Sequence, residues 1–184
     1  MRKTPLLLLA GLFFSAAFLR LAAQERRALL VGINSYSVTD GHFLPANQRG
    51  VIKNLRGAVN DARAMQAILI NRFQFKSDRI DTLMDQAATR EGMLNGLKKL
   101  LQDSRANDVA VFYYAGHGSQ VRNSLSKEYD QKDETLVPAD AWKPGVKDIR
   151  DKELAILYNL FLDKGVKLTV IMDCCHSGSI SRGP

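Results

Sequence analysis

The sequence predicts an α/β domain with three layers, in which helices cover both faces of a mostly parallel sheet. Four short apolar runs alternate along the chain with longer segments whose apolar residues recur at helical spacing. Strands separated by helices pair in parallel, because each crossover returns the chain to the same edge of the sheet. Uninterrupted apolar runs also indicate strands that are buried on both faces. The expected strands are residues 28–33, 80–83, 109–114 and 168–172.

Three amphipathic helices are expected between these strands. Thr89 is a suitable N-cap for the second helix, because its hydroxyl can accept a hydrogen bond from a backbone N–H of the first turn. Apolar faces of this kind pack against a sheet, so we expect none of them to be a binding site. The residues at helical spacing are Val59, Ala62, Met65 and Leu69, then Met93, Leu97, Leu100 and Leu101, then Leu154, Leu157, Tyr158 and Phe161.

Two long stretches predict irregular structure. Residues 37–53 contain two glycines and a proline, and residues 120–145 are rich in charges and contain two prolines. Loops of this length in a compact domain are commonly functional. Both would leave strands at their carboxyl ends, so we expect them to form the walls of a groove at that edge of the sheet.

An imidazole and a thiol closely follow two of the predicted strands. The run 109–114 leads into a Gly-His-Gly turn at His117, and the run 168–172 leads into Cys175. The carboxyl ends of neighbouring parallel strands form the crevice where α/β proteins bind ligands, so these two side chains are expected to meet there. A thiol beside an imidazole is the arrangement of a nucleophile with its general base.

The two cysteines are adjacent in sequence and are expected to differ in role. A disulfide between neighbours would be strained, and paired zinc-binding cysteines normally have two to four residues between them, so neither a disulfide nor a zinc site is expected. Alternation along the strand points Cys174 and Cys175 in opposite directions, which favours Cys174 as a small buried hydrophobe and Cys175 as the reactive thiol. His42 lies in a loop without a visible partner and His176 belongs to the nucleophile's turn, which leaves His117 as the base.

Five short motifs occur in order between residues 27 and 178. They are LVGINSY at 30–36, LRGAVNDA at 55–62, YYAGHGSQ at 113–120, DETLVPAD at 133–140 and DCCHSG at 173–178. Their sequence and order resemble those of caspase-like cysteine peptidases, specifically the bacterial metacaspase-like branch. The resemblance implies the caspase-like fold and a peptidase that works through a His117 and Cys175 dyad, with no cofactor. It also implies an oxyanion hole formed by the backbone N–H groups of Cys175 and Gly118; the sequence offers no identifiable carboxylate to orient His117.

Asp61 and Asp173 are the expected substrate-binding residues. Asp61 lies in the first turn of a helix that begins at the crevice, and Asp173 precedes the nucleophile by two residues, so both acids would attract a basic side chain. Each has a plainer alternative: an acid that favours a helix N-terminus, or a strand-end carboxylate satisfied by backbone donors. The resemblance favours the substrate role. At the substrate-binding positions caspases hold an arginine and a glutamine, whereas metacaspases hold two aspartates and cut after arginine or lysine. This chain has Leu55 in place of the caspase arginine. The expected partner is a peptide or protein substrate with arginine or lysine before the cut.

The calcium-binding pattern of some metacaspases is not preserved. Asp133 and Asp151 match two of its acids, but Arg150 and Arg182 replace two others. Hard cations need several oxygen ligands, so we expect calcium-independent activity and no metal site. Ala115 also departs from the family, since many metacaspases have a serine beside the His-Gly pair.

The ends of the chain predict export and an incomplete catalytic domain. Residues 1–23 have the basic start, the apolar run and the small residues at Ala22-Ala23 of a signal peptide, which predicts a periplasmic or secreted protein; an uncleaved anchor is the alternative. Residues 24–184 form the expected large-subunit-like catalytic domain, which lacks the strands that follow the nucleophile in the caspase fold. We expect a longer natural C-terminus, a second chain or a dimer to complete the sheet. Without the three basic residues of the signal segment the formal net charge of +7 becomes +4, and no basic patch with interleaved aromatics predicts nucleic-acid binding.

Two other functions stay open from the sequence. The first is a catalytically weak or silent scaffold of the same fold that binds a partner chain, against which the presence of both His117 and Cys175 argues. The second is a different cysteine peptidase with the same strand-end geometry, such as a legumain-like or gingipain-like enzyme. Asp61 and the motif at 133–140 favour the metacaspase branch over this second alternative.

Overall fold

The strands and helices follow the predicted order. A computed structural model describes residues 24–36, 52–123, 125, 129 and 131–174. The expected signal peptide at 1–23, most of the first long stretch (37–51) and the chain from Cys175 onward lie outside these residues. The strands and α-helices are β1 (Arg26–Gly32), α1 (Ala58–Phe73), β2 (Ile80–Met84), α2 (Arg90–Asp103), β3 (Val109–Ala115), β4 (Gly118–Arg122), β5 (Lys132–Leu136), β6 (Ile149–Arg150), α3 (Asp151–Asp163) and β7 (Lys167–Asp173).

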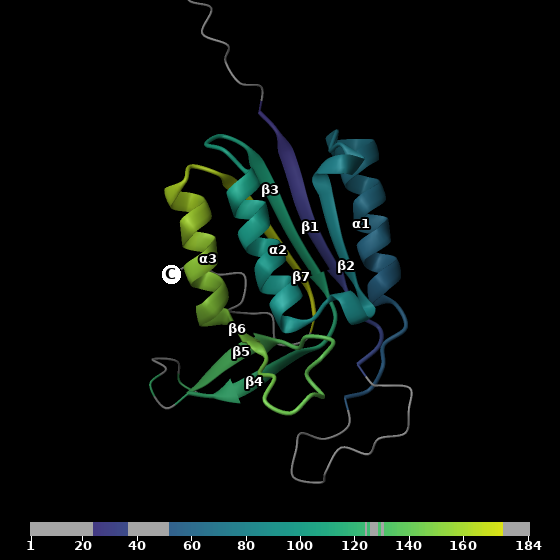
Figure 1. The fold of residues 1–184 in the computed structure, drawn as a ribbon, viewed down its shortest axis with the longest axis vertical. Coiled ribbons are helices and arrows are strands. Elements are labelled where there is room, and N and C mark those ends of the chain that lie inside the picture. The colour runs from purple at the N-terminus through teal and green to yellow at the C-terminus, as the bar shows by residue number, and fades with distance from the viewer. Residues whose placement is uncertain (1–23, 37–51, 124, 126–128, 130, 175–184) are drawn as a thin grey trace, which may run out of the picture.

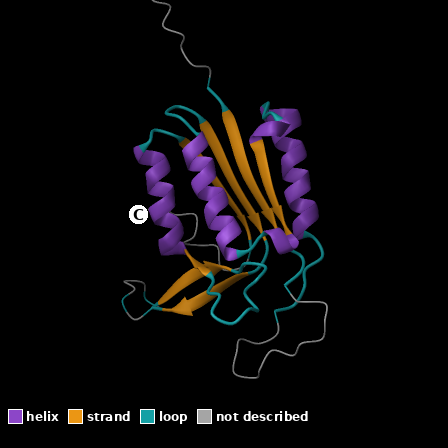
Figure 2. Ribbon diagram, in the orientation of Figure 1, coloured by secondary structure: helices purple, strands orange, loops and turns teal. Residues whose placement is uncertain are grey.

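Four parallel strands form the central sheet, in the order β2-β1-β3-β7 (Figure 2). The register aligns their carboxyl ends: Gly32 lies opposite both Met84 and Ala115, and Ala115 lies opposite Asp173. All four predicted strands are therefore confirmed. The segments that leave β1, β3 and β7 start from the same edge of the sheet.

Helices cover both faces of this sheet (Figure 1). α1 packs on the face to which β1 contributes Ala28 and Leu30, whereas α2 and α3 pack on the face to which it contributes Leu29 and Val31. Because alternate residues of a strand point to opposite faces, the central strand supplies both halves of the core. The three-layer α/β fold and the predicted apolar helix faces are confirmed.

The start of α1 lies directly against the end of β1. A Cβ atom on Gly32 would lie 2.7 Å from the carbonyl oxygen of Ala58 and 2.9 Å from Cβ of Ala62, so only glycine fits there. Asn34, just after β1, accepts a hydrogen bond from the Val59 N–H at 3.4 Å and so satisfies one free donor of the helix start. This close packing brings the first turn of α1 to the carboxyl edge of the sheet.

The other two helices have capping interactions at their starts. Thr89 Oγ1 accepts a hydrogen bond from the Gly92 N–H at 3.0 Å, which confirms it as the N-cap of α2. The Arg150 N–H donates to the Glu153 carboxylate at 3.2 Å at the start of α3, and Glu153 also pairs with Arg90 of α2. These contacts fix the two helices to each other as well as to the sheet. Of the helices in the described part of the chain, none has the length and apolar character needed to cross a bilayer.

A second, smaller sheet corrects the prediction of irregular structure at residues 120–145. β4, β5 and β6 pair antiparallel in that order. The prediction was wrong because the inward-facing residues of β5 include the polar Asp133 and Thr135, which are buried. Their polar groups are satisfied, Thr135 Oγ1 donating to the Asp148 carboxylate at 3.0 Å. Because these buried positions hold polar residues with hydrogen-bond partners, the strand shows no alternation of apolar and polar residues that sequence analysis could detect.

Candidate active site

The carboxyl edge of the central sheet carries the predicted site. Ala115 at the end of β3 lies opposite Asp173 at the end of β7, and the Gly116 N–H donates to the Asp173 carbonyl at 3.3 Å. His117 follows β3 by two residues. Cys175, which follows β7 by two residues, lies outside the described residues. The register thus places side by side the two strand ends from which the expected dyad continues.

A backbone carbonyl and an aromatic ring orient the imidazole of His117. Nε2 lies 2.7 Å from the carbonyl oxygen of Lys53, and the ring packs on Tyr36 with centroids 4.8 Å apart and planes inclined at 52°. A carbonyl oxygen can only accept a hydrogen bond, so this contact requires the proton on Nε2 and leaves the lone pair of Nδ1 for a general base. Lys53 therefore fills the orienting role for which the sequence offered no carboxylate.

Two tyrosine hydroxyls hold the backbone of His117. Its N–H donates to Tyr36 Oη at 2.7 Å, and the Tyr114 hydroxyl lies within donating distance of the His117 carbonyl at 2.8 Å and of the Val137 carbonyl at 2.9 Å. Tyr36 is 1% exposed and Tyr114 is 0% exposed. Hydrogen bonds in such dry surroundings do not compete with water and are stronger for it. The backbone of the predicted base is therefore fixed on both sides.

Gly116 is required by these two hydroxyls. A Cβ atom at this position would lie 2.6 Å from Tyr36 Oη and 2.6 Å from Tyr114 Oη. Both oxygens are anchored by hydrogen bonds, so neither can move aside without releasing His117. The glycine before the base thus permits the close approach that the arrangement needs.

Side-chain hydrogen bonds hold the backbone of the segment after β1 that carries Tyr36. The Asp85 carboxylate, just after β2, accepts the N–H groups of Asn34 at 2.8 Å and Ser35 at 3.0 Å. The side-chain carbonyl of Asn54 accepts the Tyr36 N–H at 2.9 Å. The ends of two neighbouring strands therefore cooperate in placing the ring that packs on His117.

Burial keeps both tyrosine hydroxyls neutral. It raises the pKa of Tyr36 to about 12, although the hydrogen bond from the His117 backbone works in the opposite direction. Burial likewise raises the pKa of Tyr114 well above its ordinary value, and the neighbouring Tyr36 raises it further. A neutral phenol can donate as well as accept, which the contacts with the carbonyl of His117 require.

Gly118 presents its backbone N–H away from the small sheet. It begins β4 and lies opposite Leu136 of β5. The neighbouring Val137 N–H donates to the His117 carbonyl at 3.0 Å, so Gly118 and Leu136 form one of the non-hydrogen-bonded pairs of the ladder. The Gly118 N–H therefore points outward from β5, as a donor to a substrate oxygen must.

Cys174 continues the alternation of β7, as predicted. It packs against the core on the α2 and α3 face, together with Leu168, Val170 and Met172. The side chain is half-buried rather than fully buried. Cys174 is thus part of the packing beneath the site.

The hydroxyl of Tyr113 contacts one predicted substrate-binding acid, Asp173, and is affected electrostatically by the other, Asp61. Tyr113 Oη donates to Asp173 Oδ2 at 3.2 Å. Burial raises the pKa of Tyr113, and the negative charges of Asp173 and then of Asp61 raise it further. The two aspartates are exposed, whereas Tyr113 and Ala115 lie in the core beneath α1. The structure thus places the exposed carboxylate of Asp173, from β7, on this phenol, and the charge of the exposed Asp61, from α1, acts on the same group.

Cationic side chains face the acids that matched a calcium pattern. Asp133 is 1% exposed; Asn123 Nδ2 donates to its two oxygens at 2.9 and 3.0 Å, and Arg150 Nη1 lies 3.4 Å from Oδ2. Asp151 Oδ2 lies 3.0 Å from Lys152 Nζ. Among the described residues, no group of three or more His, Cys, Asp or Glu side chains is placed to hold a metal ion.

Comparisons with known proteins agree with the motifs. The family model for the metacaspase peptidase C14 domain matches residues 26–184. The chain belongs to this family. Metacaspase-1B of Neurospora crassa is 35% identical over 161 residues, which are 84% of this chain and 34% of that protein. Metacaspase-1 of Arabidopsis thaliana is 40% identical over 132 residues, which are 68% of this chain and 35% of that protein.

A solved structure supports the caspase-like fold of this metacaspase-family chain. Protein GSU0716 from Geobacter sulfurreducens superposes with a TM-score of 0.63 at 31% identity, covering 84% of this chain and 52% of that one. The predicted family and the caspase-like fold are therefore confirmed. The chain spans about a third of the length of the two metacaspases named above.

Sequence analysis did not assign a functional role to Tyr36, Tyr113 or Tyr114. They lie in or beside apolar strands, where they are typical of a hydrophobic core. The available signal was the hydroxyl group itself, because phenylalanine fills similar space and a buried tyrosine hydroxyl usually has a partner. The identity of those partners depends on contacts between segments that are distant in sequence.

Proposed function

We propose that this chain forms the catalytic part of a cysteine endopeptidase that cuts peptide bonds after arginine or lysine. Membership of the metacaspase family supports the peptidase chemistry. The observation that carries the proposal is the presence, at one sheet edge, of an oriented His117 imidazole and of two carboxylates near Tyr113. The first supplies a base for a thiol, and the second attracts a basic substrate side chain.

In the proposed reaction His117 acts first as the general base. Nδ1 takes the proton of the Cys175 thiol, and the thiolate sulfur attacks the substrate carbonyl carbon while the C=O π electrons move onto the oxygen. The oxyanion accepts hydrogen bonds from the N–H groups of Cys175 and Gly118. The Lys53 carbonyl stabilises the resulting imidazolium, because Nε2–H still donates to it.

Collapse of the tetrahedral intermediate completes acyl transfer. The carbonyl re-forms, the C–N bond breaks, and the Nδ1 proton passes to the leaving amine. A water molecule then gives a proton to Nδ1 and attacks the thioester, the C–S bond breaks, and the proton returns to the sulfur. The products are an amine, a carboxylic acid and the original thiol, so the dyad is regenerated.

The proposed preference for a basic residue rests on the surroundings of Asp173. Tyr113 donates to one carboxylate oxygen and leaves the other for the substrate. A guanidinium or ammonium group approaching Asp61 and Asp173 would make charge-assisted hydrogen bonds. Ala115 has no hydroxyl to offer Asp173. The side-chain hydroxyl proposed to position this acid is therefore that of Tyr113.

Additional polypeptide is proposed to complete the enzyme. Within the described residues β7 forms an edge of the central sheet, and such edges are usually paired or covered. A longer natural C-terminus, a second chain or a dimer partner that supplies a strand would cover this edge. Export to the periplasm or the cell exterior, proposed from the signal-like segment 1–23, places the substrates outside the cytoplasm.

The proposed function is tested by a scan of peptides that differ only in the residue before the cut. We expect turnover with arginine and lysine, its loss in Cys175→Ala and His117→Ala, and little turnover with aspartate. Cleavage after aspartate, or equal activity in Cys175→Ala, would overturn the proposal. Binding of a partner chain without turnover in any of these peptides would favour the scaffold alternative.

A further inference from the structure

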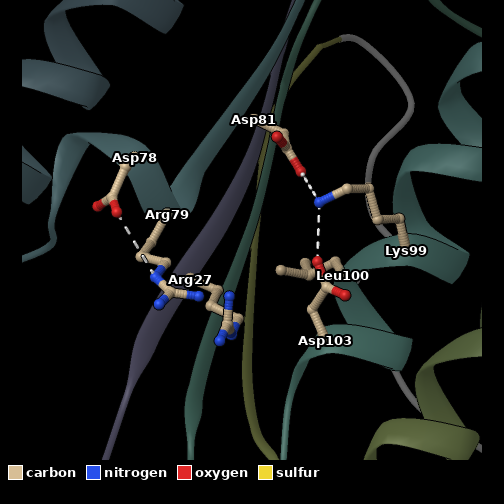
Figure 3. A pocket seen from close by; sticks show the side chains of 7 residues that line it. All are labelled: Arg27, Asp78, Arg79, Asp81, Lys99, Leu100 and Asp103. Atoms are coloured by element: carbon tan, nitrogen blue, oxygen red, sulfur yellow. Dashed lines mark hydrogen bonds and ion pairs between the residues drawn. The ribbon is translucent and has the colours of Figure 1, made fainter.

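Guanidinium groups gather at the amino edge of the central sheet, opposite the edge that carries His117. Arg27 is the second residue of β1, and Arg79 immediately precedes β2. Figure 3 shows both side chains reaching toward the same space, beside the end of α2. An adjoining open hollow of about 470 Å³ is lined by Arg27, Arg79, Gln102, Asp103, Ser104, Arg105 and Lys164. Four cationic side chains therefore face this hollow, against one carboxylate.

The nearby carboxylates are already engaged by another cation. Lys99 Nζ lies 3.0 Å from Asp81 Oδ2 and 2.8 Å from Asp103 Oδ2 (Figure 3). The hydrogen bond from Lys99 lowers the pKa of Asp103, and the charges of Arg27 and Arg79 add to this effect. The single acid of the hollow thus has Lys99 as its partner and cannot neutralise two guanidinium groups as well.

The guanidinium groups lack matching acceptors among the described residues. The Nε atoms of Arg27 and Arg79 are both buried without a hydrogen-bond partner there. The sole ion pair of Arg79 within that part of the chain is a 3.9 Å contact with Asp78, whose side chain is 73% exposed. Buried donors are normally satisfied, and an unsatisfied group commonly marks a missing water or ion. Residues 1–23 contain no acid, so they offer no side-chain counter-charge.

We propose that this hollow binds a phosphate group, either as free phosphate or as part of a small phosphorylated molecule. Guanidinium forks match phosphate oxygens and bind them in pairs. An excess of three positive charges suits a multivalent anion better than a single carboxylate. Lys164 donates to the carbonyls of Leu101 and Gln102, and its third N–H remains for the ligand. The volume is large enough for a phosphate with a small organic group.

The phosphate site is separate from the proposed catalysis. It lies at the opposite end of the strands from His117. Phosphate bound there stabilises the fold whether or not the chain is a peptidase. A ligand that binds only the folded state raises the free energy of unfolding by RT ln(1 + [L]/Kd), where [L] is the free ligand concentration. The test therefore measures binding and thermal unfolding, and its outcome does not depend on Cys175 or His117.

The experiment compares inorganic phosphate, pyrophosphate, glycerol 3-phosphate and citrate at constant ionic strength set with chloride. Unfolding temperature and titration calorimetry are measured on the whole chain and on Arg27→Gln, Arg105→Gln and Arg63→Gln. Arg63 is exposed on α1 and gives the same charge change away from the hollow.

We expect saturable binding of the phosphates by calorimetry and an unfolding temperature that rises with the logarithm of their concentration above Kd. Binding is expected to weaken about tenfold or more in Arg27→Gln and Arg105→Gln and to be unchanged in Arg63→Gln. Tighter binding of glycerol 3-phosphate than of phosphate assigns a phosphorylated molecule, and equal binding assigns free phosphate. Citrate binding as tightly as pyrophosphate, equal weakening in Arg63→Gln, or no effect beyond chloride would overturn the proposal. Arg105→Gln keeps the test decisive if Arg27→Gln does not fold, because Arg105 is exposed.

Discussion

The backbone N–H of His117 donates a 2.7 Å hydrogen bond to the phenol oxygen of Tyr36, whose ring also packs against the imidazole. One side chain therefore fixes both the backbone and the ring of the predicted base. Tyr36 reaches this position from the segment after β1, whereas His117 follows β3. The arrangement depends on the parallel pairing of these two strands.

Tyr36→Phe should lower kcat about tenfold and leave KM nearly unchanged. The change keeps the ring but leaves the His117 N–H without its acceptor, and an unpaired buried donor costs about 1–3 kcal/mol, while about 1.4 kcal/mol corresponds to tenfold in rate. Steady-state kinetics on an arginine peptide measure the effect. Tyr158→Phe is the control, because the buried Tyr158 hydroxyl has no hydrogen-bond partner in the described part of the chain. Equal kcat in Tyr36→Phe and wild type would refute the positioning role.

Gly116→Ala should destabilise the fold by about 1–3 kcal/mol, as overpacking of a tight site does. The added methyl group would lie 2.6 Å from the hydroxyls of both Tyr36 and Tyr114. The double variant Gly116→Ala with Tyr36→Phe should lose less stability than the sum of the two single changes, because one clash is removed. Urea denaturation of the three variants measures this coupling, and simple additivity would show that the clash is absent.

Stability should fall as the pH rises from about 10 to about 12, in part through Tyr36. Its pKa in the folded chain is raised to about 12 by burial, whereas an unfolded tyrosine ionises near pH 10. Between these values the unfolded state has lost the proton and the folded state retains it, so unfolding becomes easier by up to about 1.4 kcal/mol per pH unit. Tyr36→Phe should show a shallower loss in denaturation curves recorded across this range. An identical slope in both proteins would contradict the assignment.

Tyr113→Phe should raise KM for arginine peptides by a factor of about two to ten, the effect expected from one modest hydrogen bond. The hydroxyl that donates to Asp173 at 3.2 Å is removed while the buried ring stays. Asp173→Asn should have the larger effect, because it removes the charge that attracts the substrate. Steady-state kinetics on an arginine peptide measure both changes. A Tyr113→Phe enzyme with unaltered KM would show that the phenol does not position the acid.

Activity should be insensitive to added calcium and to EGTA, and Arg150→Ala should lower stability by about 1–3 kcal/mol. Arg150 lies 3.4 Å from the buried Asp133 carboxylate, and loss of a partner leaves that charge less compensated; the estimate is reduced because the Arg150 side chain is 42% exposed. Turnover assays with and without calcium, and denaturation of the variant, measure the two effects. Activity that requires calcium would refute the interpretation of Arg150.

The sequence predicts the layers and the sheet edge of the site because these depend on local patterns. Apolar runs identify the four parallel strands, and helical spacing identifies the three helices. The convergence of His117 and Asp173 follows from parallel pairing alone. The packing of Cys174 on the α2 and α3 face of the core also follows from alternation along one strand, although its side chain is half-buried rather than fully buried.

The missing elements depend on contacts that no local pattern encodes. The small antiparallel sheet contains the buried Asp133, which is compensated by Asn123 and Arg150 from other segments. Similarly, the Lys53 carbonyl that orients His117 is a backbone group, present at every residue. Its role depends on where the chain after β1 passes the end of β3, which only the folded structure shows.

The measurement that tests the central claim most directly is covalent labelling with a thiol-reactive peptide that ends in arginine, followed by peptide mapping. The account predicts one adduct on Cys175, lost in Cys175→Ala, strongly slowed in His117→Ala and retained in Cys174→Ala. A matched probe that ends in aspartate should react far more slowly. Labelling of Cys174 in place of Cys175, or faster reaction with the aspartate probe, would contradict the account.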